Sequence, residues 1–248
     1  MFVLTFSSHK GGSGKTTLAG HVAVEAERAG HGPVAVIDTD PQGSLADWWN
    51  ERESETPVFV HTYVSQLFDD LEQLRKMGMA VVVIDTPPAI TATIERVIEL
   101  SDMVVIPTRP SPHDLRAVGA TVELVERHNK PMVFVLNAAP ARARITGEAA
   151  IALSQHGTLA PVTVFQRTEF ASSMIDGRTV MELSGASRSA NEISQLWQYL
   201  WARLNKRPHQ TQISLGSGSQ KAARATAAAA EKAASGPSET GGEGPVSW

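Results

Sequence analysis

A run of glycine, lysine and threonine residues near the start of the chain has the composition of a phosphate-binding turn. It reads Lys10-Gly11-Gly12-Ser13-Gly14-Lys15-Thr16-Thr17 and lies between an apolar segment and a helical pattern. Glycines let backbone N–H groups turn inward around phosphate oxygens, and the start of a helix adds the positive end of its dipole. Lys15 would reach the β- and γ-phosphates, the Thr16 hydroxyl would coordinate Mg²⁺, and Thr17 would lie near the α-phosphate.

This run departs from the standard pattern G-x-x-x-x-G-K-[ST] at its first position, where His9 replaces glycine. A second lysine, Lys10, stands beside it. The charge on a γ-phosphate must be neutralised as its transition state forms, and some proteins receive a cation from a neighbouring molecule for this purpose. Lys10 leads away from its own loop and could reach a neighbour's nucleotide. We therefore expect ATP binding and dimerisation to be one event.

Three aspartates are candidates for metal binding and for orienting water. Asp85 ends the apolar run Val81–Ile84, where a carboxylate is costly unless it is paired or serves a cation. Asp38 and Asp40 lie two positions apart after an earlier strand, so alternation points both towards the same mouth. A carboxylate beside Mg²⁺ is chemically adequate to orient an attacking water. The segment Asp40-Pro41-Gln42-Gly43 is equally typical of a plain turn.

Short apolar runs alternate with longer helical patterns along most of the chain. The predicted strands are Phe2–Ser7, Val34–Ile37, Val81–Ile84, Met103–Ile106 and Met132–Leu136, with Pro161–Phe165 as a weaker candidate. The predicted helices are Thr16–Ala29, Leu45–Arg52, Ser65–Lys76, Thr91–Leu100, Pro112–His128, Gly147–Gln155 and Arg188–Leu204. This order predicts an α/β fold with three layers, a mostly parallel sheet with helices on both faces. Ligands of such sheets bind at the carboxyl ends of the strands, where the candidate residues stand.

Composition sets the domain organisation and removes several classes of protein. We expect one domain over residues 1–207 and a disordered tail over 208–248, because the tail is rich in Ala, Gly and Ser and has few large apolar residues. Cysteine is absent, which excludes disulfides and Fe–S clusters and fits a cytoplasmic protein. No apolar stretch is long enough for a transmembrane helix, and the chain does not begin like a signal peptide.

Three motifs in the correct order resemble the ParA/MinD family of deviant Walker A ATPases. The run from Lys10 to Thr17 is similar to K-G-G-x-G-K-[ST]-T, Asp38–Gly43 to D-x-D-P-Q-G, and Val82–Pro88 to the Walker B region. The segment from Arg167 to Glu192 also resembles the family pattern, so the resemblance covers roughly residues 1–205. It implies a P-loop NTPase fold, ATP and Mg²⁺ as cofactors, and an ATP-dependent homodimer.

The resemblance also implies individual roles. Lys10, Lys15 and Asp40 would be catalytic, with Lys10 reaching across the dimer and Asp40 orienting water. Thr16, Asp38 and Asp85 would form the metal region. Asn137, which follows a strand, would contact the adenine base, although an asparagine before Ala-Ala-Pro is also an ordinary loop residue.

The partner depends on which branch of the family the chain follows. ParA-type members bind DNA non-specifically, and residues 127–207 carry 10 Lys or Arg against 5 Asp or Glu. The candidate phosphate contacts are Arg142, Arg144, Arg167, Arg178, Arg188, Arg203, Lys206 and Arg207. MinD-type members bind membrane through an amphipathic helix, and a stripe in the last predicted helix could supply one or could simply be core. That stripe consists of Ile193, Leu196, Trp197, Leu200, Trp201 and Leu204.

The resemblance therefore implies a cytoplasmic, nucleoid-associated ATPase that positions a plasmid, a chromosome region or a protein assembly. A partner protein on the cargo would stimulate its slow hydrolysis. The alternatives are a MinD-like membrane-cycling regulator and a nucleotide-dependent scaffold that does not hydrolyse ATP. Intact Lys15, Thr16, Asp40 and Asp85 argue against the scaffold. With only Tyr63 and Tyr199, the chain also lacks the tyrosine-rich tail of a bacterial tyrosine kinase.

Overall fold

The computed structural model describes residues 1–89, 92–184 and 186–206. Within them, six strands form one sheet in the order β3-β2-β4-β1-β5-β6. All paired strands run parallel. The strands are β1 Phe2–Phe6, β2 Val34–Asp38, β3 Val58–Phe59, β4 Val81–Asp85, β5 Met103–Thr108 and β6 Met132–Leu136. The predicted tail over 208–248 lies outside the described residues.

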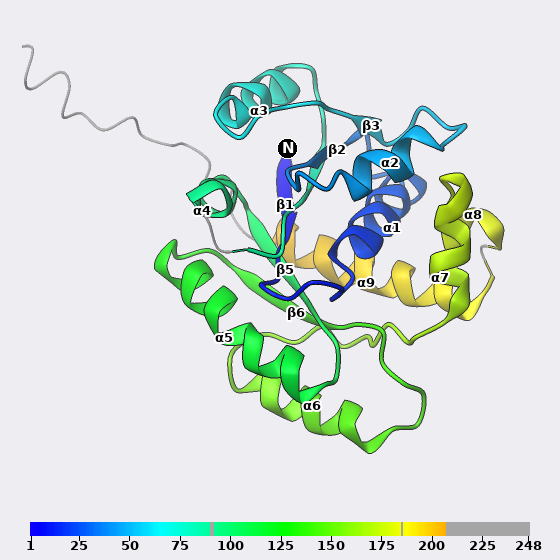
Figure 1. The fold of residues 1–248 in the computed structure, drawn as a ribbon. Coiled ribbons are helices and arrows are strands. Elements are labelled where there is room, and N and C mark those ends of the chain that lie inside the picture. Colours follow the sequence, from blue (N-terminus) through cyan, green and yellow to red (C-terminus); the bar gives the residue numbers. More distant parts are fainter. Residues whose placement is uncertain (90–91, 185, 207–248) are drawn as a thin grey trace, which may run out of the picture. The chain divides into compact units, whose positions relative to one another are not determined.

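Helices cover both faces of this sheet, as the sequence predicts (Figure 1). One face is packed by α1 Lys15–Arg28, α2 Ser44–Asn50, α8 Val180–Leu183 and α9 Arg188–Asn205. The other is packed by α3 Leu67–Lys76, α4 Ala92–Glu99, α5 Pro112–Arg127 and α6 Arg144–Ser154. Two short elements, α7 Thr168–Ser173 and the 3-10 helix η1 Met174–Asp176, precede α8. Alternate strand residues enter opposite cores, because successive side chains of a strand point to opposite faces.

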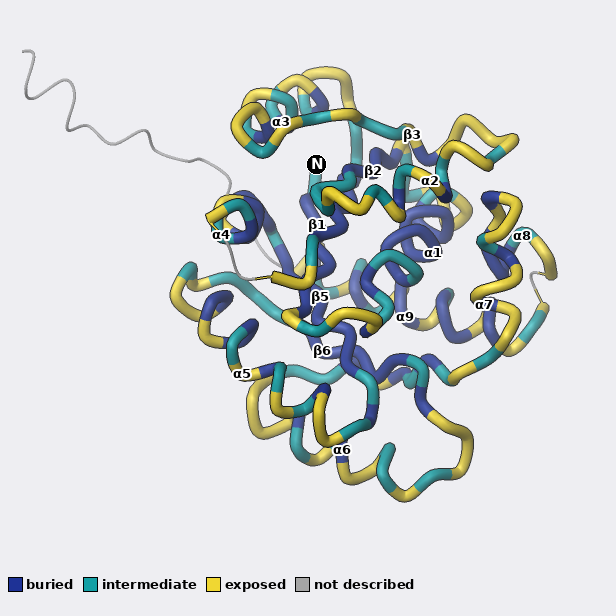
Figure 2. Tube along the Cα trace, in the orientation of Figure 1, coloured by how far each residue is buried: buried dark blue, intermediate teal, exposed yellow. Residues whose placement is uncertain are grey.

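Burial is greatest where the central strands meet α1 (Figure 2). Every residue of β4 and β5 is buried, which explains why these strands are continuously apolar and end in a single polar residue. Leu18, Ala19, Val22 and Ala23 give α1 its fully buried side against the sheet. The carboxyl ends of β1, β2 and β4 are therefore held by a packed core directly beneath the loops that extend from them.

The structure differs from the sequence prediction at the sheet edges. Pro161–Phe165 is not a regular strand, because the described chain makes only isolated bridges there, Phe134 with Leu159 and Ala139 with Phe165. A two-residue edge strand, β3, was not predicted. The helices α7 and α8 were also not predicted, since segments of six and four residues carry too little periodicity to be recognised.

The apolar stripe of the last helix packs in the core. Ile193, Leu196, Trp197 and Leu200 are fully buried, Leu204 is nearly so, and Trp201 is half-buried. They join the core cluster that contains α1 and the central strands, so the core interpretation of this stripe is confirmed. In the described part of the chain, no helix has the length and apolar character needed to span a membrane.

Candidate functional site

The glycine-rich turn connects β1 to α1 at the carboxyl edge of the sheet. Gly12 and Gly14 have φ angles of 72° and 92°, in the left-handed region that favours glycine. A Cβ at Gly14 would also lie 2.0 Å from the Asn137 amide nitrogen, so a larger residue there is excluded by space as well. Gly14 precedes the first residue of α1, which directs the helix N-terminus into the turn.

Lys15, Thr16 and Asp85 come together beneath this turn. Thr16 Oγ1 donates to Asp85 Oδ2 at 2.5 Å, which joins the start of α1 to the end of β4. Asp85 is 1% exposed and Lys15 is also buried. Burial lowers the pKa of Lys15, an effect that the charges of Asp85 and Asp40 oppose.

The Asp85 carboxylate lacks full compensation for its charge. Its pKa is raised to about 7, chiefly by burial and also by the neighbouring charge of Asp38, against the opposing effects of Thr16, Lys15 and the backbone N–H of Thr86. A bound cation would supply the missing compensation, because a positive charge nearby favours the ionised form. This is the property expected of a carboxylate that serves a metal.

Asp38 has a different environment from the one its predicted metal role implies. Its Oδ1 accepts from the backbone N–H of Asp40 at 2.9 Å, and its Oδ2 accepts from Leu45 and Ala46 at 2.9 and 3.1 Å. Burial raises its pKa, and these N–H donors oppose the rise. Asp38 therefore caps α2 and shapes the turn that carries Asp40, while its part in metal binding stays a prediction.

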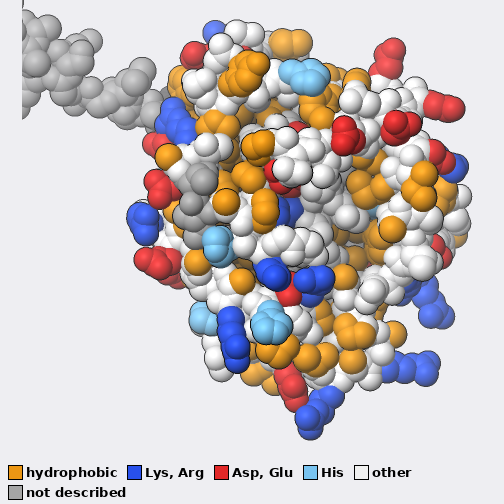
Figure 3. Space-filling view, viewed as in Figure 1, with side chains coloured by type: hydrophobic (Ala, Val, Ile, Leu, Met, Phe, Trp, Pro, Cys, Tyr) orange, Lys and Arg blue, Asp and Glu red, His pale blue; other side chains and the backbone are white. Residues whose placement is uncertain are grey.

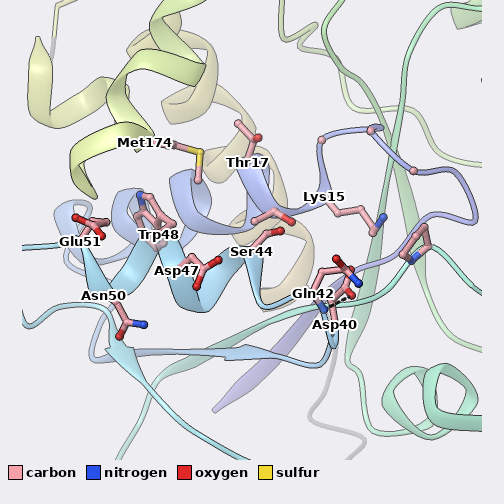
Figure 4. Close-up of a pocket in the computed structure, with 15 residues that line it drawn as sticks. Lys15, Thr17, Asp40, Gln42, Ser44, Asp47, Trp48, Asn50, Glu51 and Met174 are labelled. Atoms are coloured by element: carbon pink, nitrogen blue, oxygen red, sulfur yellow. Dashed lines mark hydrogen bonds between the residues drawn. The ribbon is translucent and has the colours of Figure 1, made fainter.

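An open cleft of about 950 Å³ extends from the turn along α2. Figure 4 shows Lys15 and Thr17 on one side, Asp40 and Gln42 below Lys15, and Trp48 and Met174 at the far end. The cleft is lined by Gly11, Gly12, Gly14, Lys15, Thr16, Thr17, Asp40, Gln42, Ser44, Asp47, Trp48, Asn50, Glu51, Pro88 and Met174. The predicted water-orienting Asp40 thus shares one cleft with most of the predicted phosphate-binding residues.

Sequence reasoning missed the far end of this cleft. Trp48 is held by α2, where its ring packs 3.2 Å from a Cβ position at Gly20, and its indole N–H donates to the Arg178 carbonyl at 3.1 Å. Met174 lines the cleft from η1, more than 150 positions after the glycine-rich turn. A helical pattern after Gly43 could have indicated Trp48, but no local signal marks Met174.

Asn137 lies against the glycine-rich turn. Its Nδ2 donates to the Ser13 carbonyl at 2.8 Å, and the residue is buried. The observed contact supports the shape of the turn from the end of β6. Contact with a base stays a prediction, and Asn137 does not line the cleft described above.

Lys10 is half-buried and its backbone N–H donates to Ser8 Oγ at 3.4 Å. Its side chain forms no ion pair or hydrogen bond with the described residues. This side chain is therefore a cation available for contact with a second molecule, and that contact stays a prediction.

The residues present fit a magnesium nucleotide. Ser13 Oγ is buried and has no hydrogen-bond partner among the described residues, so the turn holds an unsatisfied polar atom. The Thr16 hydroxyl and the Asp85 carboxylate are hard oxygen donors of the kind Mg²⁺ prefers. Within the described residues no group of three His, Cys, Asp or Glu side chains could hold an ion. Few protein ligands suit Mg²⁺, which usually keeps several waters and binds phosphate oxygens.

The candidate DNA contacts are scattered and partly paired. Arg167 bonds Glu192 at 2.6 Å, Arg178 bonds Asp176 at 2.5 Å, and Arg144 bonds Glu148 at 3.1 Å. The exposed members among the others include Arg142, Arg188 and Lys206, and Arg207 lies outside the described residues. Figure 3 shows acidic side chains gathered near α2 and basic ones along the edge near α6.

Comparisons with known proteins agree with this geometry. Residues 4–180 match the model of the CobQ/CobB/MinD/ParA nucleotide binding domain. The chain is 31% identical over 208 residues to Maintenance of carboxysome distribution protein A of Halothiobacillus neapolitanus, covering 79% of this chain and 94% of the relative.

Two solved structures share the fold at low sequence identity. One is the ATP complex of an McdA variant from Cyanothece, with a TM-score of 0.64, 16% identity, and coverage of 86% of this chain and 99% of that one. The other is the cell division protein MinD of Aquifex aeolicus, with a TM-score of 0.68, 16% identity, and coverage of 82% and 98%. With this match over residues 4–180, a glycine-rich turn between β1 and α1, and a parallel sheet, this chain belongs to the CobQ/CobB/MinD/ParA nucleotide-binding family.

Proposed function

We propose that this protein is a ParA-like ATPase that positions a large protein assembly on the nucleoid. The observation that carries this proposal is the junction of Lys15, Thr16 and Asp85 beneath a glycine-rich turn, with Asp40 in the same cleft. In this proposal the junction binds a nucleoside triphosphate with its cation, and Asp40 lies near the terminal phosphate. The relative with a role in carboxysome distribution favours a protein assembly over a plasmid as the cargo.

Each residue then has a defined task. The glycine backbone of the turn and Lys15 bind and orient the phosphates, and the α1 dipole favours their negative charge. Thr16 and Asp85 would hold Mg²⁺, which supplies charge neutralisation on the phosphate oxygens when bound. Asp40 accepts a hydrogen bond from the attacking water and orients it, and Asp38 fixes the turn that carries Asp40.

The proposed cycle needs a second copy of the chain. ATP closes a dimer in which Lys10 of each protomer reaches the partner's nucleotide. The dimer binds duplex DNA without sequence preference, and a cargo-bound partner protein stimulates slow hydrolysis and release. In this proposal the protein is cytoplasmic and nucleoid-associated. The burial of the α9 stripe supports DNA over membrane as the surface, because all of its residues except the half-buried Trp201 lie in the core.

The test measures phosphate release and DNA binding by the purified full chain with Mg²⁺ and ATP. We expect slow hydrolysis, and salt-dependent binding to arbitrary duplex DNA with ATP but not ADP. Lys15→Gln should abolish both. Asp40→Ala should lower hydrolysis about 100-fold while DNA binding persists. Asp69→Ala, which changes an exposed acid on α3 outside the cleft, is the matched control and should stay near wild type.

The two alternative functions, a non-hydrolysing scaffold and a MinD-like regulator, predict different results in these assays. Absence of phosphate release from wild type would leave the non-hydrolysing scaffold. ATP-dependent co-sedimentation with anionic liposomes, without DNA binding, would indicate the MinD-like regulator. Capture of the cargo partner by Asp40→Ala with ATP, and not by Lys15→Gln, would support the positioning role.

A further inference from the structure

Arg109 lies just after β5 and has no role in the nucleotide site proposed above. Arg109 Nε donates to Asp114 Oδ1 at 3.1 Å, and its Nη2 lies 3.4 Å from Asp114 Oδ2. Asp114 is 3% exposed and is itself fixed, because Ser111 Oγ donates to its carboxylate at 2.5 Å and accepts from its backbone N–H at 3.2 Å. Two nitrogens of the guanidinium are therefore held by a buried acid at the start of α5.

The third nitrogen points to the phosphate-binding turn. Arg109 Nη1 lies 3.9 Å from the Cβ position at Gly12, the left-handed glycine in the middle of the turn. This nitrogen donates no hydrogen bond within the described part of the chain. The side chain is 40% exposed, so the free edge of the guanidinium is accessible to a ligand.

An arginine that only neutralised Asp114 could approach it from any direction. Here the buried carboxylate of Asp114 accepts hydrogen bonds from one edge of the guanidinium. The other edge lies beside the glycine-rich turn that also contains Lys10 and Lys15. A guanidinium is planar, permanently charged and matched to phosphate oxygens. Its orientation by a rigid partner lowers the entropy lost when it binds.

We infer that Arg109 contacts the terminal phosphate of ATP and distinguishes ATP from ADP. This inference rests on the proposed function, and it adds a third cation to the two lysines of the turn. Asp114 and Ser111 are positioning residues for Arg109. The phosphate belongs either to the nucleotide of the same protomer or to that of the dimer partner, and mixed dimers distinguish these two sources.

The first experiment compares wild type with Arg109→Ala and Arg109→Lys in the full chain. We expect Arg109→Ala to lower kcat about 100-fold and to weaken ATP-dependent dimerisation. Affinity for ADP should change about twofold or less, because ADP lacks the terminal phosphate that Arg109 contacts. Arg109→Lys should recover only part of the loss, since an ammonium cannot bond Asp114 and a phosphate with the same fork.

The controls separate this role from a structural one. Arg127→Ala removes a comparably exposed arginine that pairs with Glu95 and Glu123 away from the turn, and it should keep wild-type kinetics. Asp114→Asn should lower kcat by a smaller factor, because Arg109 keeps its charge but loses its orientation. Thermal melting confirms that each variant folds. The inference is overturned if folded Arg109→Ala retains wild-type kcat and wild-type preference for ATP over ADP.

Mixed dimers assign the source of the phosphate. Arg109→Ala is combined with Asp40→Ala, each being nearly inactive alone. If Arg109 acts on the partner's nucleotide, one site of the mixed dimer contains both Arg109 and Asp40, and hydrolysis returns. If it acts on its own nucleotide, no site is complete and hydrolysis stays low. If the wild-type protein itself did not hydrolyse ATP, the result would contradict the proposed function and not only the role of Arg109.

Discussion

Two aspartates in register on neighbouring strands, Asp38 and Asp85, have opposite environments. They are paired residues at the ends of β2 and β4. Asp38 accepts three backbone hydrogen bonds from the turn and helix that come after it. Asp85 is more deeply buried and accepts from Thr16 and from the backbone N–H of Thr86. At the same edge of the sheet, Asp38 therefore fixes the following turn and helix, whereas Asp85 is the aspartate available to bind a cation.

The difference arises from the segment that extends beyond each strand. After β2 the chain turns sharply, so the N–H groups at the start of α2 point back at Asp38. After β4 the chain continues through Thr86 and two prolines, and proline has no N–H to donate. A buried carboxylate with a single backbone donor keeps a desolvation cost that a bound cation would offset.

The largest expected effect is on magnesium-dependent binding at Asp85. Asp85→Asn keeps an acceptor for Thr16 but removes the charge. We expect Mg²⁺-dependent ATP hydrolysis to fall about 1000-fold, in line with losing one preorganised electrostatic group at a phosphoryl-transfer site. Phosphate release measured against Mg²⁺ concentration checks this. Asp38→Asn should retain a clear Mg²⁺ dependence, and an equal loss of Mg²⁺ dependence at both positions would break the comparison.

The same substitution should change stability in opposite directions at the two positions. Burial raises the pKa of Asp85 to about 7 in the folded protein. Above pH 7, without nucleotide or Mg²⁺, the buried carboxylate is ionised, and its uncompensated charge lowers the stability of the fold. Asp85→Asn should then raise the free energy of unfolding by about 2 kcal/mol at pH 8. Asp38→Asn should lower it by about 2 kcal/mol, since one amide oxygen cannot serve donors on both sides.

Urea denaturation in EDTA at pH 8 measures both changes. At pH 5 the gain for Asp85→Asn should shrink, because wild-type Asp85 is then protonated and neutral. A destabilised Asp85→Asn protein at pH 8 would contradict the account of Asp85 as an uncompensated charge.

A third buried group, His21, sharpens the comparison through its pH dependence. His21 Nδ1 bonds the Thr17 carbonyl and its Nε2 accepts from the Val180 N–H, so the neutral ring joins α1 to α8. Burial lowers its pKa to about 4. The unfolded chain takes up a proton near pH 6.5 while the folded chain does not, so the contribution of His21 to stability is complete above pH 6.5 and is lost as pH falls towards 4.

We expect this group to cost about 2 kcal/mol of stability at pH 5 relative to pH 7. His21→Gln should be less stable at pH 7 but should lack this part of the pH dependence. Denaturation curves of both proteins at pH 7 and pH 5 provide the measurement. An unchanged difference between wild type and His21→Gln at the two pH values would show that His21 does not titrate as described.

The sequence alone determined the glycine-rich turn between a strand and a helix, the parallel α/β architecture and the positions of Asp38, Asp40 and Asp85. These features are local. Left-handed backbone requires glycine, buried parallel strands require continuous apolar runs, and strand ends carry the polar groups. The predicted strands β1, β2, β4, β5 and β6 are each present within one or two residues of their expected ends.

Only the tertiary structure decided which contacts those residues make and therefore which role each can have. The contact between Asn137 and Ser13 joins positions more than 120 residues apart, and Met174 reaches a cleft whose other wall is α2. The same holds for Arg109 beside Gly12. Hydrogen bonding and desolvation depend on which atoms surround a group, and distant segments supply those atoms here. Two aspartates that look alike in the sequence therefore become a helix cap and a candidate metal ligand only when the chain is folded.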